Sequence, residues 1–378
     1  MHLLFLPRWY PSVYDNMFGL FVKKHAEAAG LHHRISVLYV QGISTKKLLV
    51  KQAYKEEGTV STYSFFYKNV SCSLWNQFRF WYYLLVGYRT IVRRLGKPDK
   101  IHVHILTRLG LFALFLKFYS NTPYIISEHW SRYQKTPGTY KGWLRKKITK
   151  MVVEKAQAVL PISENLAHAM RSHQLQNPNY QIIPNVVDDI FFESIKSKKN
   201  DKTIFIHVST FEDRSKNISG ILRTIKQLSE KTMDFEFRFI GDGIDFKKLN
   251  NYADDLSIPK GLITFTGVQT DKALVAEYCE ADFLVVFSHF ENIPVVINEA
   301  LTCGLPVIAT NVGGIAEYIH AENGFLIEAA NEHQLLTLFL RLVEQKPQFD
   351  SKKIRKAAFK QFSRVEIGRR LDALYREN

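Results

Sequence analysis

The sequence predicts an α/β fold built from two doubly wound domains that face one another across a cleft. Along the whole chain, short runs rich in Val, Ile and Phe alternate with segments of helical periodicity, as in parallel sheets with crossover helices. The chain of 378 residues is too long for one ordinary domain. A charged segment that is poor in apolar residues, within 182–202, separates the two alternating halves.

The first half is expected to begin with a buried strand. Its first residues, MHLLFLPRWYPS, carry no basic segment ahead of the apolar run, and Pro7 ends that run, which argues against a signal peptide. The expected strands are short apolar runs bounded by turn-forming or charged residues. They lie near 2–6, 34–40, 59–66, 100–104, 123–127, 157–160 and 180–183.

The second half repeats the same alternation after a boundary that we expect near 187–200. Pro184 and Asn185 form a turn there, before the apolar run TIFIHV begins a new strand. The strands of this half are expected near 203–208, 235–240, 262–266, 282–287, 305–309 and 324–327. In doubly wound sheets, ligands bind at the carboxyl ends of the strands.

Composition excludes several classes of protein. No run of 18 uncharged apolar residues is present, so a membrane-spanning helix is not expected. The three cysteines lie far apart and fit neither a disulfide framework nor a zinc site, which favours the cytoplasm. The net charge of +15 is uneven: residues 1–185 carry 26 Lys and Arg against 8 Asp and Glu, and the rest carry 25 against 28. One half is therefore expected to face a polyanion or an anionic membrane.

The stretch ENIPVVINEALTCG places two carboxylates around the start of a helix. Glu291 should lie in the loop after a strand, and Pro294 and Gly304 suit the first helical position and the helix end. Glu299 then lies about 7–8 Å along the helix axis. Free N–H groups at the start of a helix can bind a phosphate. Carboxylates accept hydrogen bonds from hydroxyl groups, so the two acids suit the sugar and the ribose on either side of a diphosphate. Alternatively, Glu299 is a solvated helix residue and Glu291 interacts with the helix dipole.

These residues resemble the E-x7-E signature of retaining glycosyltransferases of family 4, which have the GT-B fold of two facing Rossmann-like domains. The similarity covers nearly the whole chain in the family's order. In the second half it includes CEADFLVVFSHFE at 279–291, GDG at 241–243 and FTG at 265–267. In the first half it is looser and includes WYPS at 9–12, FGLFV at 18–22, VHIL at 103–106, SEHW at 127–130, ISENL at 162–166 and IPNVVD at 183–188.

The resemblance implies the domain limits and several site residues. An acceptor domain of residues 1–187 would be joined by a C-terminal helix at about 360–378, and residues 188–359 would bind the donor. Glu299 would contact the donor ribose and Glu291 the transferred sugar, while His129 would face that sugar. The loop over the sugar would be formed by Asn292, Ile293 and Pro294.

The resemblance also implies glycines where the backbone approaches the donor. Gly19, after the first strand, would let the chain approach the diphosphate closely, although an ordinary turn glycine remains an alternative. Gly241 belongs to the GDG motif. Gly313 and Gly314 are interpreted as part of the base or phosphate site, or as packing between a strand and a helix.

The loop after the first strand of the second domain departs from the family's pattern. The family places an arginine there and, about five residues later, a lysine, and both neutralise the diphosphate. Lys216 matches the lysine, but Ser209 or Thr210 occupies the arginine position. Arg214 is the substitute that we expect, unless it is only a surface charge. No Asp-x-Asp pair suits a metal, so a metal-independent reaction is expected. The resemblance implies that the reaction retains the anomeric configuration.

Two basic segments that carry aromatic residues are candidates for binding an anionic membrane surface or the acceptor. Residues 74–95 are typical of an amphipathic helix at a membrane interface, and a second cluster follows at 141–150. Solvated helix faces are the alternative, and nucleic acid is not expected because no recognisable reader motif is present. The candidate residues are Arg79, Arg93, Arg94, Trp143, Lys146 and Lys147.

The sequence thus predicts a glycosyltransferase that moves a sugar from a UDP- or GDP-linked donor to a glycan or a polyprenyl-diphosphate-linked acceptor, without a cofactor. Synthesis of capsule, lipopolysaccharide or exopolysaccharide on the inner face of the cell membrane is the expected setting. Two alternatives stay open: an epimerase or hydrolase that processes nucleotide sugars, and a non-catalytic subunit that binds them. A dinucleotide oxidoreductase is disfavoured because no G-x-G-x-x-G follows the first strand of either half.

Overall fold

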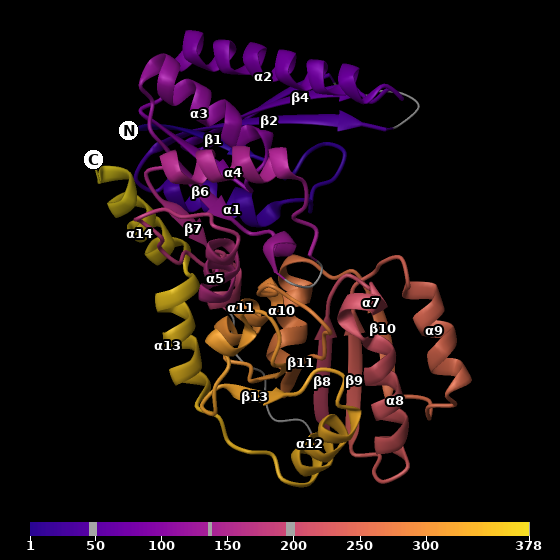
Figure 1. The fold of residues 1–378 in the computed structure, drawn as a ribbon. Coiled ribbons are helices and arrows are strands. Elements are labelled where there is room, and N and C mark those ends of the chain that lie inside the picture. The colour runs from indigo at the N-terminus through magenta and orange to yellow at the C-terminus, as the bar shows by residue number, and fades with distance from the viewer. Residues whose placement is uncertain (45–50, 135–137, 194–200, 378) are drawn as a thin grey trace. The chain divides into compact units, whose positions relative to one another are not determined.

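The computed structural model describes residues 1–44, 51–134, 138–193 and 201–377 (Figure 1). The chain divides into two compact units. Unit 1 comprises Met1–Val186 and Arg364–Asn378, and unit 2 comprises Val187–Ser363. Part of the expected boundary segment, 194–200, lies outside the described residues.

Unit 1 contains a seven-stranded sheet in the order β3-β4-β2-β1-β5-β6-β7. All neighbouring strands are parallel except β3, which pairs antiparallel with β4. Without β3, this is the strand order of a doubly wound sheet. Strands up to β4 are added toward one edge and strands from β5 onward toward the other edge, so the strand order reverses between β1 and β5. The strands are β1 (His2–Pro7), β2 (Arg34–Ile43), β3 (Gln52–Glu57), β4 (Val60–Lys68), β5 (Lys100–His104), β6 (Tyr124–Glu128) and β7 (Val159–Pro161).

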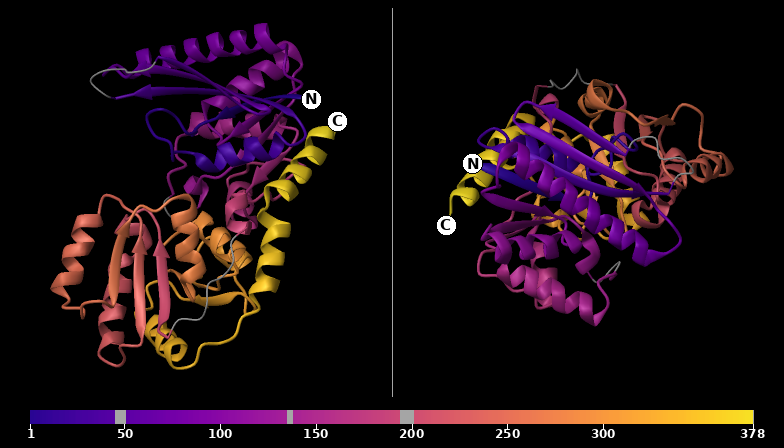
Figure 2. Two further views of the ribbon diagram at one scale, coloured as in Figure 1. Left: turned by 180° about the vertical axis from the view of Figure 1, so that it is seen from behind. Right: turned by 90° about the horizontal axis from the view of Figure 1, so that it is seen from above.

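Helices cover both faces of this sheet (Figures 1 and 2). One face is covered by α2 (Ser73–Leu95), α3 (Arg108–Ser120) and α4 (Trp143–Lys155). The other is covered by α1 (Leu20–Ala29), which packs against α14 (Arg364–Arg376). Contact between α1 and α14 is close, since a Cβ at Gly368 would lie 2.6 Å from the carbonyl oxygen of Ala28. The short helices of this unit are η1 (Ser131–Tyr133) and α5 (Glu164–Ser172).

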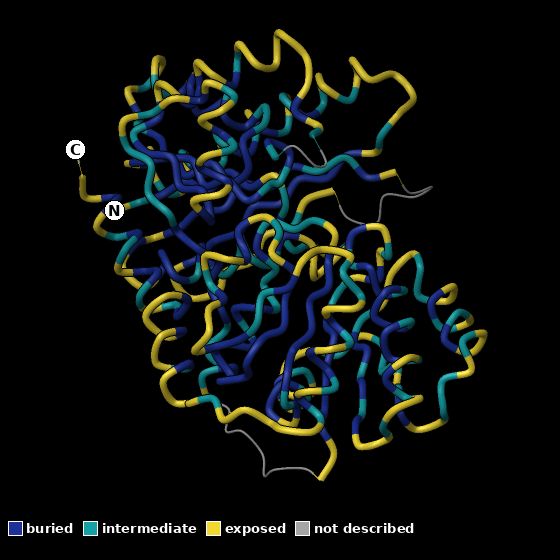
Figure 3. Tube along the Cα trace, turned by 60° about the horizontal axis from the view of Figure 1, so that its bottom comes forward, coloured by how far each residue is buried: buried dark blue, intermediate teal, exposed yellow. Residues whose placement is uncertain are grey.

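Unit 2 contains a six-stranded, fully parallel sheet in the order β10-β9-β8-β11-β12-β13. This too is a doubly wound order, and it reverses between β8 and β11. Its central strands β8, β11 and β12 are buried throughout, whereas the edge strand β10 is only partly buried and the helices expose their outer faces (Figure 3). The strands are β8 (Thr203–Val208), β9 (Phe235–Ile240), β10 (Ile263–Gly267), β11 (Phe283–Val286), β12 (Val307–Thr310) and β13 (Gly324–Ile327).

Two apolar cores cover the faces of this second sheet. One is rich in phenylalanine and includes α8 and α12, and the other includes α10, α11 and α13. The helices are α6 (Asp189–Glu193), α7 (Asp213–Lys216), α8 (Ile218–Ser229), α9 (Phe246–Asp255), α10 (Asp271–Glu280), α11 (Val295–Thr302), η2 (Ile315–Glu317), α12 (Glu332–Glu344) and α13 (Ser351–Phe362).

The structure corrects three details of the expected elements. Residues 180–183 do not form a strand, because only Tyr180 makes a single bridge to Val159. Strand β3 was not expected, since its sequence QAYKEE is mostly exposed and lacks an apolar face. Pro294 precedes the helix instead of beginning it: its ψ of 130° is extended, and α11 begins at Val295.

Candidate functional site

The candidate site of unit 2 lies where two loops leave neighbouring strands at the reversal of the strand order. The first loop follows β8 and leads into α7, and the second follows β11 and leads into α11. Their backbones are joined, because the N–H of His289 donates a hydrogen bond of 2.8 Å to the carbonyl oxygen of Ser215. In a doubly wound sheet this is the position at which ligands bind.

At this position the structure brings together Lys216 and Glu291. The ammonium group of Lys216 donates a hydrogen bond to Oε1 of Glu291, and both side chains are mostly buried, with 18% and 11% exposure. The hydroxyl of Ser288 donates a second bond of 3.0 Å to the same oxygen. Ser288 is itself held by Thr310 on β12, whose hydroxyl donates to the Ser288 carbonyl oxygen over 2.7 Å. A partly buried cation and anion are therefore held at the strand ends.

The loop after β8 is fixed by local hydrogen bonds, which orient Lys216. The backbone N–H of Asp213 bonds the carboxylate of Asp245 at 2.9 Å, and the Asp213 carboxylate accepts from the N–H of Ser219 at 2.8 Å. Asn217, directly after Lys216, has a left-handed φ of 51° that separates α7 from α8. The lysine thus lies at the end of a short, braced turn.

Glycines let three loops pack around this cluster. Gly313 has φ of 58°, and a Cβ there would lie 2.1 Å from the carbonyl oxygen of Glu291. The N–H of Gly314 donates to the Asn292 carbonyl oxygen over 2.9 Å. On the other side, a Cβ at Gly241 would lie 1.9 Å from the Ser209 carbonyl oxygen. Gly313 and Gly241 therefore permit contacts between backbones that a side chain would block.

The loop from Asn292 to Pro294 connects Glu291 to α11. Ile293 is buried with 6% exposure, whereas Asn292 and Pro294 retain partial exposure. Arg214, by contrast, is exposed on α7, and the structure places Lys216 beside Glu291. A role for Arg214 toward a diphosphate stays a prediction.

Glu299 has a different environment from Glu291. Its carboxylate accepts a hydrogen bond of 2.9 Å from the hydroxyl of Tyr278 on α10. Burial, together with the negative charge of Asp188, raises the pKa of Glu299 to about 7, although the Tyr278 bond acts in the opposite direction. Near neutral pH this carboxyl group is therefore held close to its titration midpoint.

We expect the raised pKa of Glu299 to appear in the pH dependence of stability. Its value is 4.5 in the unfolded chain, so the folded protein binds more protons between pH 4.5 and about 7, and its stability falls as the pH rises through that range. Glu299→Gln should remove this decline and add about 1–2 kcal/mol to the free energy of unfolding at pH 8, after allowance for partial exposure. Urea unfolding of both proteins at pH 5 and 8 measures it. An equal pH dependence in the two proteins would contradict the assignment.

In unit 1, Gly19 lies at the end of the connection that follows β1, and His129 lies at the start of the connection that follows β6. Gly19 precedes α1 with φ of 75°, and a Cβ there would lie 2.3 Å from the carbonyl carbon of Trp9. His129 follows β6 and is buried, with Nδ1 3.1 Å from Oδ1 of Asn185. Burial first, and the neighbouring His25 second, hold the pKa of His129 well below its usual value, so its imidazole is neutral.

The basic and aromatic candidates lie on two helices of unit 1. Arg79 is partly buried and donates to the Lys68 carbonyl oxygen over 2.7 Å, whereas Arg93 and Arg94 are exposed in the last turn of α2. At the start of α4, Trp143 is 76% exposed. Lys146 and Lys147 in the same helix are also exposed. In the part of the chain that the structure describes, no helix combines the length and apolar character needed to cross a bilayer.

Sequence reasoning missed residues that orient the predicted ones. Ser288 bonds Glu291, Asn185 bonds His129, and Tyr278 bonds Glu299. A serine at the end of an apolar strand, three residues before an acid, is a usable signal for the first. Tyr278 gives no such signal, because it lies in α10, whereas Glu299 lies in α11.

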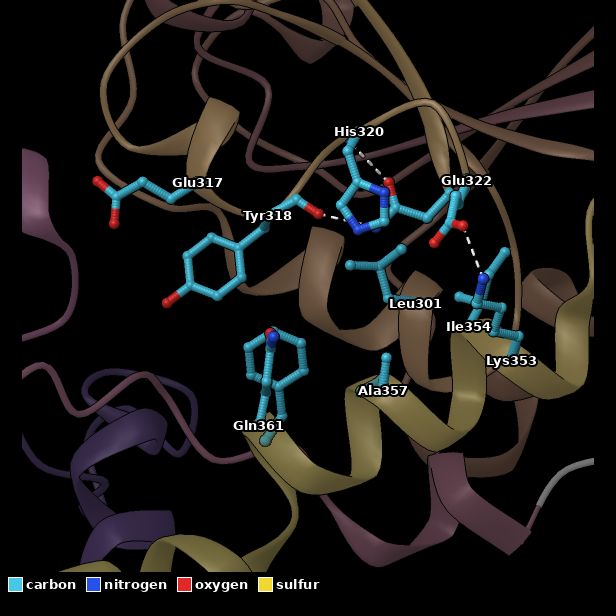
Figure 4. Close-up of a pocket in the computed structure, with 12 residues that line it drawn as sticks. Leu301, Glu317, Tyr318, His320, Glu322, Lys353, Ile354, Ala357 and Gln361 are labelled. Carbon is cyan, nitrogen blue, oxygen red and sulfur yellow. Dashed lines mark hydrogen bonds and ion pairs between the residues drawn. The ribbon is translucent and has the colours of Figure 1, made fainter.

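Unit 2 also contains a small cavity of 160 Å³ between α13 and the chain that follows η2. Figure 4 shows Glu317 and Tyr318 at one side of it, and Lys353 and Glu322, which form an ion pair of 2.6 Å, at the other. Neither Lys216 nor Glu291 lines this cavity. It is therefore distinct from the site at the strand ends.

Two family models match the chain. The model described as glycosyl transferases group 1 matches residues 189–361, and the model described as glycosyltransferase family 4 matches residues 50–190. The two matches meet near the junction of the two units.

Individual proteins agree with the family models. An uncharacterized glycosyltransferase of Methanocaldococcus jannaschii is 27% identical over 317 residues, which is 81% of this chain and 85% of the relative. The putative teichuronic acid biosynthesis glycosyltransferase TuaC of Bacillus subtilis is 26% identical over 67% of this chain and 63% of its own length. The structure of Anabaena HepE in complex with UDP and glucose matches with a TM-score of 0.72 at 17% identity and covers 98% of both chains, which establishes the GT-B fold. The chain therefore belongs to the group 1 glycosyltransferases of family 4.

Proposed function

We propose that this protein transfers a sugar from a UDP- or GDP-linked donor to a hydroxyl group of a glycan or lipid-linked acceptor in the synthesis of a cell-surface polysaccharide. The observation that carries the proposal is the bond between Lys216 and Glu291 at the reversal of the strand order in unit 2. HepE was solved with UDP and glucose, and TuaC is named for teichuronic acid biosynthesis, which supports the donor class and the setting.

The Lys216–Glu291 pair can exchange partners when a donor binds. A diphosphate oxygen would accept from the Lys216 ammonium, and the Glu291 carboxylate would then accept from hydroxyl groups of the sugar. Charge that develops on the leaving diphosphate would be stabilised by Lys216, and by Arg214 if the loop brings it near. Glu299 would contact the ribose, and its carboxyl group is the better acceptor when ionised. No metal is required in this scheme.

We further propose that the reaction retains the anomeric configuration. The acceptor oxygen would form its bond to the anomeric carbon on the face from which the diphosphate leaves, and the departing phosphate oxygen would take the acceptor's proton. The role of His129 toward the transferred sugar stays a prediction of the family resemblance. An inverted product in an anomer-resolved NMR assay would contradict this mechanism.

Unit 1 is proposed to bind the acceptor, and its positive charge to hold the protein at the inner face of the cell membrane. Exposed cations and aromatic side chains on α2 and α4 support this role, including Arg93, Arg94, Trp143, Lys146 and Lys147. Each basic residue close to an anionic bilayer contributes about 1 kcal/mol to binding at moderate salt.

Thermal unfolding across a panel of nucleotides tests the proposed donor class. A nucleoside diphosphate or its sugar at 100 times its dissociation constant should stabilise the folded protein by about 2.7 kcal/mol, which raises the midpoint by about 2–4 °C. Nucleosides without phosphate should give much smaller shifts. If no nucleoside diphosphate or nucleotide sugar shifts the midpoint, the proposal fails. Donor turnover that needs no acceptor would instead favour an epimerase or hydrolase.

A further inference from the structure

Unit 1 has its own reversal of strand order, between β1 and β5, and arginines gather at the carboxyl ends of the strands there. Arg8 directly follows β1, Arg108 begins α3 in the connection after β5, and Arg132 lies in η1 after β6. Together with Arg145 of α4, they line a pocket of 630 Å³. Ligands of doubly wound sheets bind at such positions.

The pocket carries four guanidinium groups, and no carboxylate is among the described residues that line it. Arg132 is 8% exposed, and its Nε, like that of Arg108, is buried without a hydrogen-bond partner among the residues that the structure describes. Burial lowers the pKa of Arg8, and the positive charge of Arg132 lowers it further. Burial also lowers the pKa of Arg108, and the positive charge of Arg8 contributes in the same direction. An anion in this pocket would relieve the mutual repulsion and satisfy the buried donors.

Aromatic rings hold two of these arginines in place. The guanidinium carbon of Arg108 lies 3.4 Å from the centroid of the Phe80 ring, and that of Arg132 lies 3.9 Å from the centroid of Trp130. The Arg108 guanidinium also donates a hydrogen bond of 2.7 Å to the side-chain oxygen of Gln77. The positive groups are thus pre-oriented before any anion binds, which reduces the entropic cost of binding.

An apolar groove of 530 Å³ adjoins the arginine pocket, and Leu111 of α3 lines both. The groove lies among α2, α3 and α4, where Trp81 of α2, Phe115 and Phe118 of α3, and Met151 of α4 contribute to its lining. Several of these side chains are exposed: Phe118 by 70%, Phe115 by 50% and Met151 by 42%. From Leu111 to Phe118 the groove extends about 10 Å along α3, away from the arginines. Exposed apolar surface of this kind marks a binding site.

We propose that the pocket and the groove together bind one lipid, with its phosphate or diphosphate head among the arginines and its hydrocarbon chain along α3. Resting on the proposed function, this lipid is the acceptor of the sugar. The charge of the pocket selects a phosphate group, and the adjoining groove selects a hydrocarbon chain over the polar backbone of a nucleic acid. The arginine pocket alone would not select a hydrocarbon chain, and the apolar groove alone would not select a phosphate group.

Farnesyl diphosphate, used below its micelle concentration, is a suitable soluble probe for the full chain. Trp130 lines the pocket and Trp81 the groove, so tryptophan fluorescence reports occupancy at both ends. Farnesyl diphosphate should bind at least tenfold more tightly than either farnesol or inorganic diphosphate, because only it uses both parts of the site.

Two variants and two matched controls test each part of the site. Arg145→Gln and Phe118→Glu change exposed side chains, so they should fold normally, and each should weaken farnesyl diphosphate binding about tenfold or more. Arg34→Gln removes one charge from an exposed residue at the opposite end of the strands, and Leu74→Glu changes a residue that is 80% exposed outside the groove. Both controls should bind like the original protein.

The outcomes separate this inference from the proposed function. If the variants and their controls weaken farnesyl diphosphate binding equally, the attraction is a non-specific surface effect and the inference is overturned. Single-stranded RNA that competes with farnesyl diphosphate for binding would overturn it as well. Stabilisation by UDP or GDP, measured on the same samples, should be unchanged in Arg145→Gln and Phe118→Glu. If nucleotides stabilise the protein but farnesyl diphosphate does not bind, only the lipid site fails. If the probe binds but nucleotides do not, the proposed transfer fails and the lipid site remains.

Discussion

Lys216→Ala should lower kcat/KM for sugar transfer by about 10²–10³-fold, because one positioned donor to a developing negative charge contributes about that much to catalysis. The substitution also leaves the carboxylate of Glu291 without its ammonium partner in a largely buried position, so the sugar contact should be disturbed as well. Steady-state transfer assays with a nucleotide sugar identified by the thermal panel measure the effect.

Lys226→Ala is the matched control for this prediction. Lys226 lies on α8 and pairs at 3.4 Å with Glu230, away from the strand ends. Its removal should leave kcat/KM within about twofold, as expected for a surface ion pair. Transfer by Lys216→Ala at the rate of Lys226→Ala would contradict the role of Lys216. A loss in Arg214→Ala that approaches that of Lys216→Ala would show that Arg214 shares the diphosphate charge.

Gly313→Ala is expected to lower the free energy of unfolding by about 2–4 kcal/mol and to abolish most transfer activity. The Cβ would lie 2.1 Å from the carbonyl oxygen of Glu291 and 2.9 Å from that of Asn292. Both oxygens belong to the backbone, so the clash cannot be relieved by the movement of a flexible side chain. The loop that carries Glu291 would have to shift, and the Lys216 contact would shift with it. Urea unfolding and transfer assays on the same samples measure both effects.

Gly261→Ala separates this clash from conformational strain. Gly261 also has a positive φ, of 84°, but a Cβ there would meet no atom within 4 Å. Its substitution should cost only about 1 kcal/mol of stability and leave transfer unchanged. If Gly313→Ala resembles Gly261→Ala in both measurements, the close approach of the two loops is wrong.

The apolar strands of both units were predictable because each buried parallel strand is a short apolar run, as in LLFL of β1 and FLVV of β11. Strand β3 was not, because its residues are mostly exposed and its pairing with β4 depends on a neighbour instead of an apolar face. Residues 180–183 show the opposite error, since an apolar pair at 182–183 does not suffice to extend a ladder.

The candidate site was predictable only in part. Spacing placed Glu291 after a strand and Glu299 in the following helix, which the structure confirms. Spacing could not reveal that Tyr278, from another helix, bonds Glu299, because this contact is tertiary. The arginine pocket of unit 1 was missed for the same reason. Arg8, Arg108 and Arg132 lie far apart in the sequence and meet only through the order of the strands.

A crystal structure of this chain with UDP tests the central claim most directly. We predict that a diphosphate oxygen lies within about 3 Å of the Lys216 ammonium, at the strand ends between β8 and β11. With a nucleotide sugar, the hydroxyl groups of the sugar should contact Glu291. Nucleotide bound instead in the cavity beside α13, with the Lys216–Glu291 bond unchanged, would contradict the account.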